Sequence, residues 1–174
     1  MFEFHEVVVA SASTERSPLL ESREELLITA KREALRHLVA TVAYRGSVAL
    51  SDPPVNFVAF RINEGTRTPG EILAHIGDLL EGSVHLARGE MVSLTSSPLP
   101  WNEEVSRFFA AAKRLDSYLA SNAPVACAVE KLIQGPIGDA LTHVGQLVML
   151  RRMAGKPVRV ESYFTAEISA GGIY

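Results

Sequence analysis

The sequence has little of what marks secreted, membrane-spanning or nucleic-acid-binding proteins. Its single cysteine, Cys127, cannot form a disulfide within the chain, which favours a reducing, cytoplasmic location. No uncharged apolar run approaches the roughly 18 residues that a membrane span needs. Glu3 and Glu6 stand where a signal peptide would carry basic side chains. The net charge of −3 argues against a basic nucleic-acid-binding face. We therefore predict a cytoplasmic protein that binds neither nucleic acid nor membrane.

Several catalytic and repetitive patterns are also missing. The sequence contains no nucleophile elbow, no glycine-rich phosphate loop and no CxxC pair. It has no fixed-period repeat and no low-complexity tract, which excludes solenoids. What is present is an ordinary globular composition, with 47% hydrophobic and 21% charged residues in a chain of 174. We expect one domain, residues 1–174, with a core of its own.

Four stretches with apolar residues three and four positions apart predict amphipathic helices. They span residues 22–46, 68–89, 102–122 and 136–154. The second has the clearest start, because Thr68 suits the N-cap, Pro69 the first helical position and Glu71 a capping box. Gly46 is predicted to end the first helix. Residues 125–134 are compatible with a separate short helix or with a kinked start of the last one.

The connections between these helices are unequal in length. About 20 residues, 47–67, separate the first two helices, and connections this long usually mark a crossover or a functional loop. Short strand-like stretches occur at 57–62 and 158–163. The pattern as a whole predicts an all-α fold, a four-helix bundle with long crossover connections. Its core is expected over about 22–157, with a C-terminal tail, 158–174, beyond the bundle.

The histidines differ in their position on the predicted helices. His75 lies on the flank of the second helix's apolar stripe, whereas His85 falls on the opposite, solvent-facing side. Asp139 and His143 are four residues apart on the last helix, so they share one strip beside its apolar face. His37 lies beside Leu38 on the first predicted helix, and His5 lies ahead of the predicted elements.

A carboxylate and an imidazole four residues apart can bind one cation together with a ligand from a facing helix. His75 is the histidine with suitable facing. Two histidines and one carboxylate also form catalytic zinc and non-haem iron sites. Structural roles stay open on the pattern alone. Asp139 in a first helical turn stabilises the helix dipole, and either histidine of the candidate set suits the edge of a core.

Two runs of residues resemble a known family. The run G-D-A-L-T-H-V-G-Q-L-V-M-L-R-R-M-A-G at 138–155 is similar to the last helix of the DinB/YfiT-like superfamily. That helix carries H-x-x-x-H-x-G-Q before a Leu/Arg-rich turn and a glycine. The run T-P-G-E-I-L-A-H-I at 68–76 resembles the second helix of the superfamily, whose histidine supplies the remaining ligand. The resemblance covers roughly residues 22–157.

The resemblance implies that His75 and His143 bind a divalent metal: zinc, nickel, iron or manganese. Asp139 occupies the position of the first histidine of the last-helix pair and departs from the family pattern. A carboxylate there lowers the charge of the site by one and hardens the ligand set. If Asp139 binds as well, we expect weaker or more promiscuous metal loading than in a three-histidine relative.

The activities of the superfamily set the functional expectation. They include thiol S-transferases and a thiol-dependent maleylpyruvate isomerase, and many members are assigned as metal-dependent hydrolases. The resemblance therefore implies a metal-dependent hydrolase or thiol S-transferase with a small-molecule substrate and, for transfer, a low-molecular-weight thiol. The sequence identifies no general base. The alternative is a non-catalytic stress-response or binding bundle with a degenerate site, which acts as a homodimer.

Further residues have a structural interpretation, and some of them also have a functional one. Gln146, one turn beyond the last predicted ligand, could hydrogen-bond a ligand or be an ordinary exposed side chain. Gly145 is predicted to permit the close approach of a neighbouring helix. Arg151 and Arg152 suit the dipole at a helix end, and could also hold an anionic substrate or a thiol cofactor. Cys127 is predicted to be a buried apolar thiol.

Overall fold

The computed structural model describes residues 18–173, and within that range it contains helices and connecting segments but no strand. The helices are α1 (Pro18–Leu50), α2 (Pro69–Ala87), α3 (Trp101–Ala120), α4 (Val129–Leu132) and α5 (Gly138–Met153). The prediction of an all-α fold with four long helices is therefore confirmed for these residues. None of these helices combines the length and the apolar character needed to cross a bilayer.

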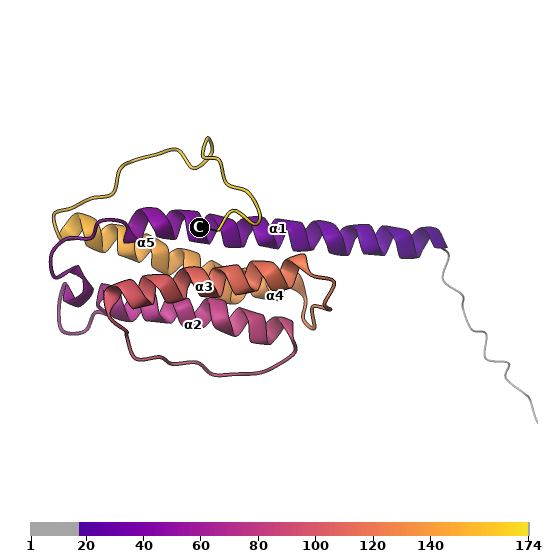
Figure 1. Cartoon of the computed structure of the whole chain (residues 1–174), viewed down its shortest axis with the longest axis horizontal. Coiled ribbons are helices and arrows are strands. Elements are labelled where there is room, and N and C mark those ends of the chain that lie inside the picture. Colours follow the sequence, from indigo (N-terminus) through magenta and orange to yellow (C-terminus); the bar gives the residue numbers. More distant parts are fainter. Residues whose placement is uncertain (1–17, 174) are drawn as a thin grey trace, which may run out of the picture.

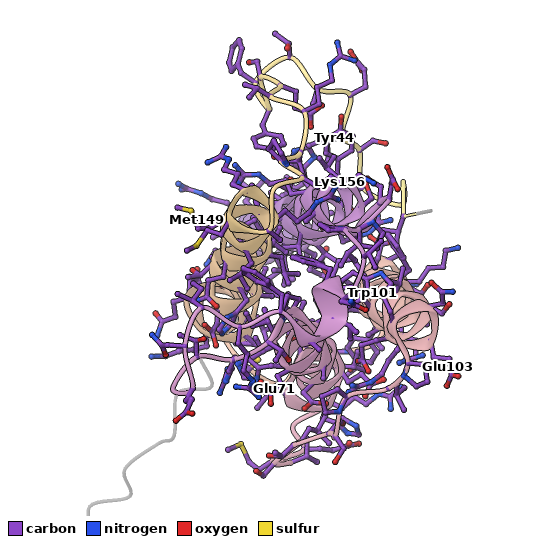
Figure 2. All side chains as sticks on the ribbon, turned by 90° about the vertical axis from the view of Figure 1, so that its left-hand side faces the viewer. Tyr44, Glu71, Trp101, Glu103, Met149 and Lys156 are labelled. Carbon is purple, nitrogen blue, oxygen red and sulfur yellow. The ribbon has the colours of Figure 1, made fainter. Side chains whose placement is uncertain are left out.

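The four long helices lie side by side (Figure 1). α1 and α2 each pack against both α3 and α5. Figure 2 looks along the helices and shows side chains filling the space between them. The buried apolar residues come from all four long helices and include Leu35, Val39, Leu73, Ile76, Phe108, Leu115, Val144 and Leu147. On α2, α3 and α5 the stripes predicted from spacing are the faces that meet in the core. On α1 the prediction is wrong, because the stripe that begins at Leu26 and Leu27 is exposed and the buried face is that of Leu35, Val39 and Ala43.

The prediction that Gly46 ends the first helix is wrong. α1 continues to Leu50, and Gly46 lies within it, against the ring of Phe108. A Cβ atom at Gly46 would lie 2.4 Å from Cζ of that ring, a distance that no real contact allows. Gly46 therefore serves a close approach between α1 and α3 instead of a helix stop.

The capping box at the start of α2 is confirmed. The hydroxyl of Thr68 accepts a hydrogen bond from the amide of Glu71 at 3.2 Å, and the carboxylate of Glu71 accepts one from the amide of Thr68 at 2.7 Å. This reciprocal pair satisfies two amides that the helix itself leaves without a partner. It sets the start of α2 two turns before His75.

The strand-like stretch at 57–62 does not form a strand. It begins with a single 3-10 turn, Phe57–Ala59. Phe57 is buried, and its ring packs edge-on against Trp101 with 5.7 Å between the ring centroids. Phe57, which the sequence places in a strand-like stretch, thus packs at one end of the helical core.

The second strand-like stretch, 158–163, also lacks regular structure. It belongs to a C-terminal segment that returns over α1 (Figure 1). The guanidinium of Arg45 lies 3.9 Å from the centroid of the Tyr163 ring, and Ile173 is buried in the core. This segment therefore contributes to the packing of the helices and does not extend away from them.

A kink precedes α5. α4 passes into a π-turn, Ile133–Ile137, in which Gly135 has a non-helical backbone (φ −94°, ψ −109°). Pro136 has no amide hydrogen to donate to the preceding turn, so the helical hydrogen-bond pattern is interrupted there. A Cβ at Gly138 would lie 2.9 Å from the carbonyl oxygen of Ile133. The segment ahead of the last helix is thus a short helix that runs into a kink, and this kink sets where the first turn of α5 faces.

Candidate metal centre

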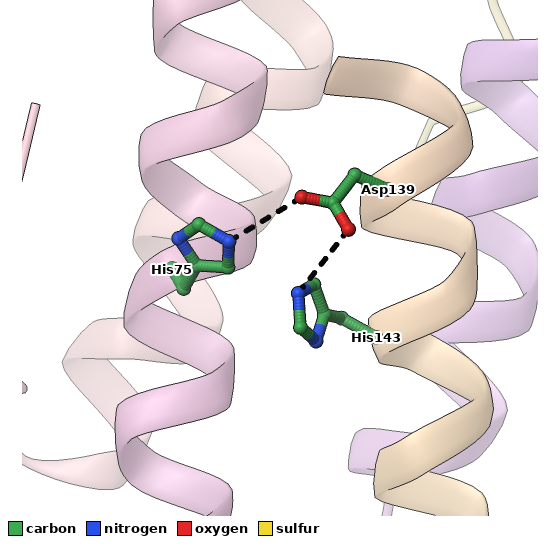
Figure 3. Close-up of side chains that lie close together, drawn as sticks. All are labelled: His75, Asp139 and His143. Atoms are coloured by element: carbon green, nitrogen blue, oxygen red, sulfur yellow. Dashed lines mark ion pairs between the residues drawn. The ribbon is translucent and has the colours of Figure 1, made fainter. Parts of the chain in front are cut away.

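The three residues predicted to bind a metal lie together between α2 and α5 (Figure 3). Asp139 stands between the two imidazoles. Its Oδ2 lies 3.5 Å from Nε2 of His75, and its Oδ1 lies 3.3 Å from Nε2 of His143. The two rings are nearly perpendicular, at 85°, with 4.8 Å between their centroids. The structure thus places the Asp–His pair of α5 opposite the histidine of α2.

The spacing of the ligand atoms suits a shared cation. Atoms that bind a tetrahedral ion at about 2.1 Å are about 3.4 Å apart, close to both distances from Asp139 to the histidines. One ligand atom from each of the three residues lies within 4.8 Å of the other two. The group could therefore hold a metal ion with two nitrogen donors and one oxygen donor.

This cluster lies at the edge of the helix packing and is open to solvent on one side. The exposed fractions of the side chains are 31% for His75, 46% for Asp139 and 12% for His143. Three ligands from the protein leave at least one position of a tetrahedral ion free. That position would face the open side, where water or a substrate has access.

Gln146 forms the hydrogen bond that was one of its two predicted roles. Its Oε1 lies 2.8 Å from Nδ1 of His143. Because a carbonyl oxygen only accepts, this bond places a hydrogen on Nδ1, and in the neutral ring Nε2 then carries the lone pair. Nε2 is the atom that faces Asp139. Such outer hydrogen bonds orient metal-binding histidines and raise their basicity.

The cluster contains no cationic side chain of its own. Among residues 18–173, no lysine or arginine forms an ion pair with Asp139, whose charged contacts are the two histidines. Within this range, the carboxylate of Asp139 thus has no lysine or arginine beside it to balance its charge. Such a site attracts a cation from solution.

The next turn of α2 carries a different kind of cluster. The carboxylate of Asp78 accepts hydrogen bonds from Arg107 and from both the amide and the hydroxyl of Ser96, at 2.8 and 2.6 Å. Burial by itself would raise the pKa of Asp78, but these hydrogen bonds outweigh it and hold the pKa below its usual value. Arg107 also donates to Glu104 at 2.9 Å. No motif in the sequence predicts this network, although Asp78 follows His75 by three residues on the same strip of α2.

A polar pocket of about 480 Å³ adjoins His75. Its lining comes from α2, from the connection 51–68 and from the connection 88–100. The polar residues that line it include Arg61, Glu64, Thr66, Arg67, Glu71, Asp78, Thr95 and Ser96. The hydrogen bonds from Ser96 to Asp78 hold the second connection against α2 on this side.

An apolar pocket of about 430 Å³ adjoins His143 on the other side. It is lined by Ile62, Thr66, Arg67, Ile72, His143, Gln146, Met149 and Leu150. Both pockets have the size of small-molecule sites, roughly 300–1,000 Å³. Thr66 and Arg67 belong to both linings, so the pockets meet at the end of the connection that precedes α2.

Of the other histidines within residues 18–173, neither joins the cluster. His85 pairs with Glu90, at the C-terminal end of α2. His37 is exposed on α1. His5 lies outside the described residues.

Three further predictions concern residues outside the cluster. Gly145 is exposed, and no described residue beyond its own helix backbone and chain neighbours would lie within 4 Å of a Cβ there, so the predicted helix approach is wrong. Arg151 is buried, and its guanidinium donates to the carbonyls of Ala49 and Ser51. It joins the ends of α1 and α5 and is not available to an anion in either pocket. Cys127 is partly buried, and burial raises the pKa of its thiol.

Comparison of the chain with protein-family models, with curated proteins and with solved structures finds no match. The resemblance to the DinB-like superfamily therefore stays a prediction from two motif runs. A metal centre is supported by the geometry of His75, Asp139 and His143.

Proposed function

We propose that this chain is a metal-dependent enzyme of the DinB-like superfamily, a four-helix bundle with long crossover connections. It acts on a small molecule as a hydrolase or a thiol S-transferase. Zinc, nickel, iron or manganese is held by His75, Asp139 and His143. The observation that carries the proposal is the approach of these side chains, from two helices, to within 4.8 Å of one another.

The three side chains contribute differently to the site. Asp139 supplies the negative charge, so that a divalent ion with its ligands has a net charge of +1. Gln146 holds the His143 ring with Nε2 directed at the centre of the group. His75 comes from the other helix, so a bound ion links α2 to α5 and stabilises the folded chain.

The open side of the site is where a substrate has access. A bound divalent ion acts there as a Lewis acid and lowers the pKa of a water or thiol that it binds. Thr66, Thr95 and Ser96 line the polar pocket, where their hydroxyls can hydrogen-bond polar parts of a substrate. The apolar pocket beside His143 takes its non-polar part. Hydrolysis uses an activated water and thiol transfer an activated thiol, so a metal centre with an open position is compatible with both reactions.

An activity screen with matched histidine variants tests the proposal. Protein loaded with each of the four metals is assayed with chromogenic esters and amides for hydrolysis, and with cysteine and an electrophilic dye for thiol transfer. We expect metal-dependent turnover in one assay that falls about 100-fold in His75→Ala and in His143→Ala, since each variant removes a ligand. His37→Ala is the matched control, because His37 is exposed on α1 and takes no part in the cluster.

Two outcomes would contradict the proposal in different ways. Stoichiometric metal binding without turnover in any assay would remove the enzymatic part and keep the metal centre. No metal binding, with unchanged stability, would support the alternative of a non-catalytic binding or stress-response bundle. Sedimentation of the purified chain would then test whether that bundle is a homodimer.

A further inference from the structure

Arg67 is an arginine beside the candidate metal centre whose side chain does not help to hold the helices and connections together. It lies at the end of the connection before α2, directly ahead of the N-cap residue, and its side chain is exposed. Other arginines near the site hold the fold together. Arg61 pairs with Glu71, and Arg107 pairs with Asp78. Within residues 18–173, the Arg67 side chain forms no hydrogen bond or ion pair, so its charge is available to a ligand.

The position of Arg67 relates it to both parts of the candidate centre. It belongs to the lining of the polar pocket, which contains His75, and to that of the apolar pocket, which contains His143. A ligand group bound by Arg67 would therefore lie beside the three candidate metal ligands. The rest of that ligand could extend into either pocket.

The apolar pocket is the better match for the part of the ligand that Arg67 does not bind. Four of its lining residues are large and apolar: Ile62, Ile72, Met149 and Leu150. Met149 is 53% exposed and Ile62 is 48% exposed, which leaves apolar surface open to solvent. Arg67 is the one permanently charged residue in this lining, whereas the polar pocket also contains carboxylates such as Glu64. The lining of the apolar pocket thus combines four large apolar side chains with one permanent positive charge.

We propose that this pocket binds a small amphiphilic anion, a carboxylate on an apolar chain. The guanidinium of Arg67 binds the carboxylate, a geometry that permits two parallel hydrogen bonds. The chain covers Met149 and the neighbouring apolar residues and removes their surface from water. The identification of this anion as the substrate class of the enzyme rests on the proposed function. The binding itself needs no metal.

Binding of octanoate to the metal-free, full-length protein tests this site. Octanamide is the neutral comparison, because it has the same chain and nearly the same shape without the charge. By calorimetry or NMR titration, we expect octanoate to bind at least tenfold more tightly than octanamide. Arg67→Gln is expected to weaken octanoate at least tenfold and to leave octanamide unchanged. Acetate, which lacks the chain, is expected to bind at least tenfold more weakly than octanoate.

Two variants make the test specific. Arg159→Gln removes the same charge from an exposed position in the C-terminal segment and is expected to change octanoate affinity less than twofold. Arg67→Lys keeps the charge without the paired donors, so an affinity between wild type and Arg67→Gln is expected. Equal binding of octanoate and octanamide, or an unchanged octanoate affinity in Arg67→Gln, would overturn the proposal. An equal loss in Arg159→Gln would do the same, because it would indicate a general charge effect.

The result is separable from that of the metal experiments. Failure of zinc to bind, with octanoate binding that depends on Arg67, would remove the proposed enzyme and keep the anion site. Zinc binding without selective octanoate binding would keep the metal centre and remove the anion site.

Discussion

Two polar clusters lie one turn apart on α2, and they differ in how their charges are balanced. In the first, Asp78 and Glu104 are buried around Arg107, with exposed side-chain fractions of 7%, 1% and 14%. Each carboxylate also accepts hydrogen bonds from the connection 88–100. Opposite charges and hydrogen bonds are both supplied by the chain, and the cluster holds the connection on the helices.

The second cluster, around His75, lacks what the first contains. Asp139 and two histidines bring together groups that bind cations, and no lysine or arginine of residues 18–173 pairs with the carboxylate. Its members are also more exposed. The difference indicates that the Asp78 cluster is complete as a structural element, whereas the His75 cluster gains a positive charge only from solution.

The largest effect is expected from the first cluster. Arg107→Ala leaves two buried carboxylates without their cation, so it should lower the free energy of unfolding by about 3–5 kcal/mol. Asp139→Ala removes a half-exposed carboxylate, so in metal-free protein it should change the free energy of unfolding by less than about 1 kcal/mol. Urea unfolding followed by the fluorescence of Trp101, the single tryptophan, measures both. Similar changes in the free energy of unfolding for Arg107→Ala and Asp139→Ala would contradict the proposed difference between the two clusters. Arg107→Lys, which retains a cation, is the variant to use if the alanine variant does not fold.

A smaller effect, on zinc affinity, is expected when the hydrogen bond between Gln146 and His143 in the second cluster is removed. Gln146→Ala removes the hydrogen bond that orients His143, and should weaken zinc binding by about 10- to 100-fold. Gln134→Ala is the matched control, because Gln134 is an exposed glutamine in the turn before α5. Isothermal titration with zinc measures both variants. An unchanged affinity in Gln146→Ala would show that the hydrogen bond does not position a metal ligand.

Replacing the carboxylate by the imidazole of the family pattern should strengthen the second cluster. Asp139→His gives three nitrogen donors, which zinc binds well, and should raise zinc affinity by about tenfold, or 1.4 kcal/mol. Competition with a chromogenic chelator measures this change. A lower or unchanged affinity would count against residue 139 as a ligand.

The smallest effect is expected in the pH dependence of stability. The pKa of Asp78 is lower in the folded chain than in the unfolded chain. Its contribution to stability is therefore fully present above the usual aspartate pKa of about 3.9, and is lost as the pH falls toward the folded value. Asp78→Asn should flatten the fall in stability between about pH 5 and pH 3. Urea unfolding at a series of pH values measures the slope, and an unchanged slope would contradict the assignment.

Local signals in the sequence predict a large part of this fold. The capping box of Thr68 and Glu71 is a short-range pattern, and it marks the start of α2 correctly. The spacing of Asp139 and His143 places both on one strip of α5 because helix geometry alone determines it. Apolar periodicity identifies the buried faces of α2, α3 and α5, since each of these helices needs one face for the core. It fails on α1, where Leu26 and Leu27 lie on an exposed stretch of the helix.

What the sequence analysis missed depends on contacts between distant segments. Gly46 resembles a helix stop, and only its contact with Phe108 shows otherwise. Phe57 belongs to a strand-like pattern, but its burial against Trp101 holds it in a tight turn. Arg67 carries no local signal either, because its place in both pockets depends on how the preceding connection folds.

Zinc titration of the metal-free protein tests the central claim most directly. The claim is that His75, Asp139 and His143 bind one cation together. Calorimetry should give one zinc ion per chain for the wild type and for His37→Ala, and a loss of affinity of at least about tenfold in His75→Ala, Asp139→Ala and His143→Ala. Binding that survives in all three variants with unchanged affinity, or no binding by the wild type, would contradict the account.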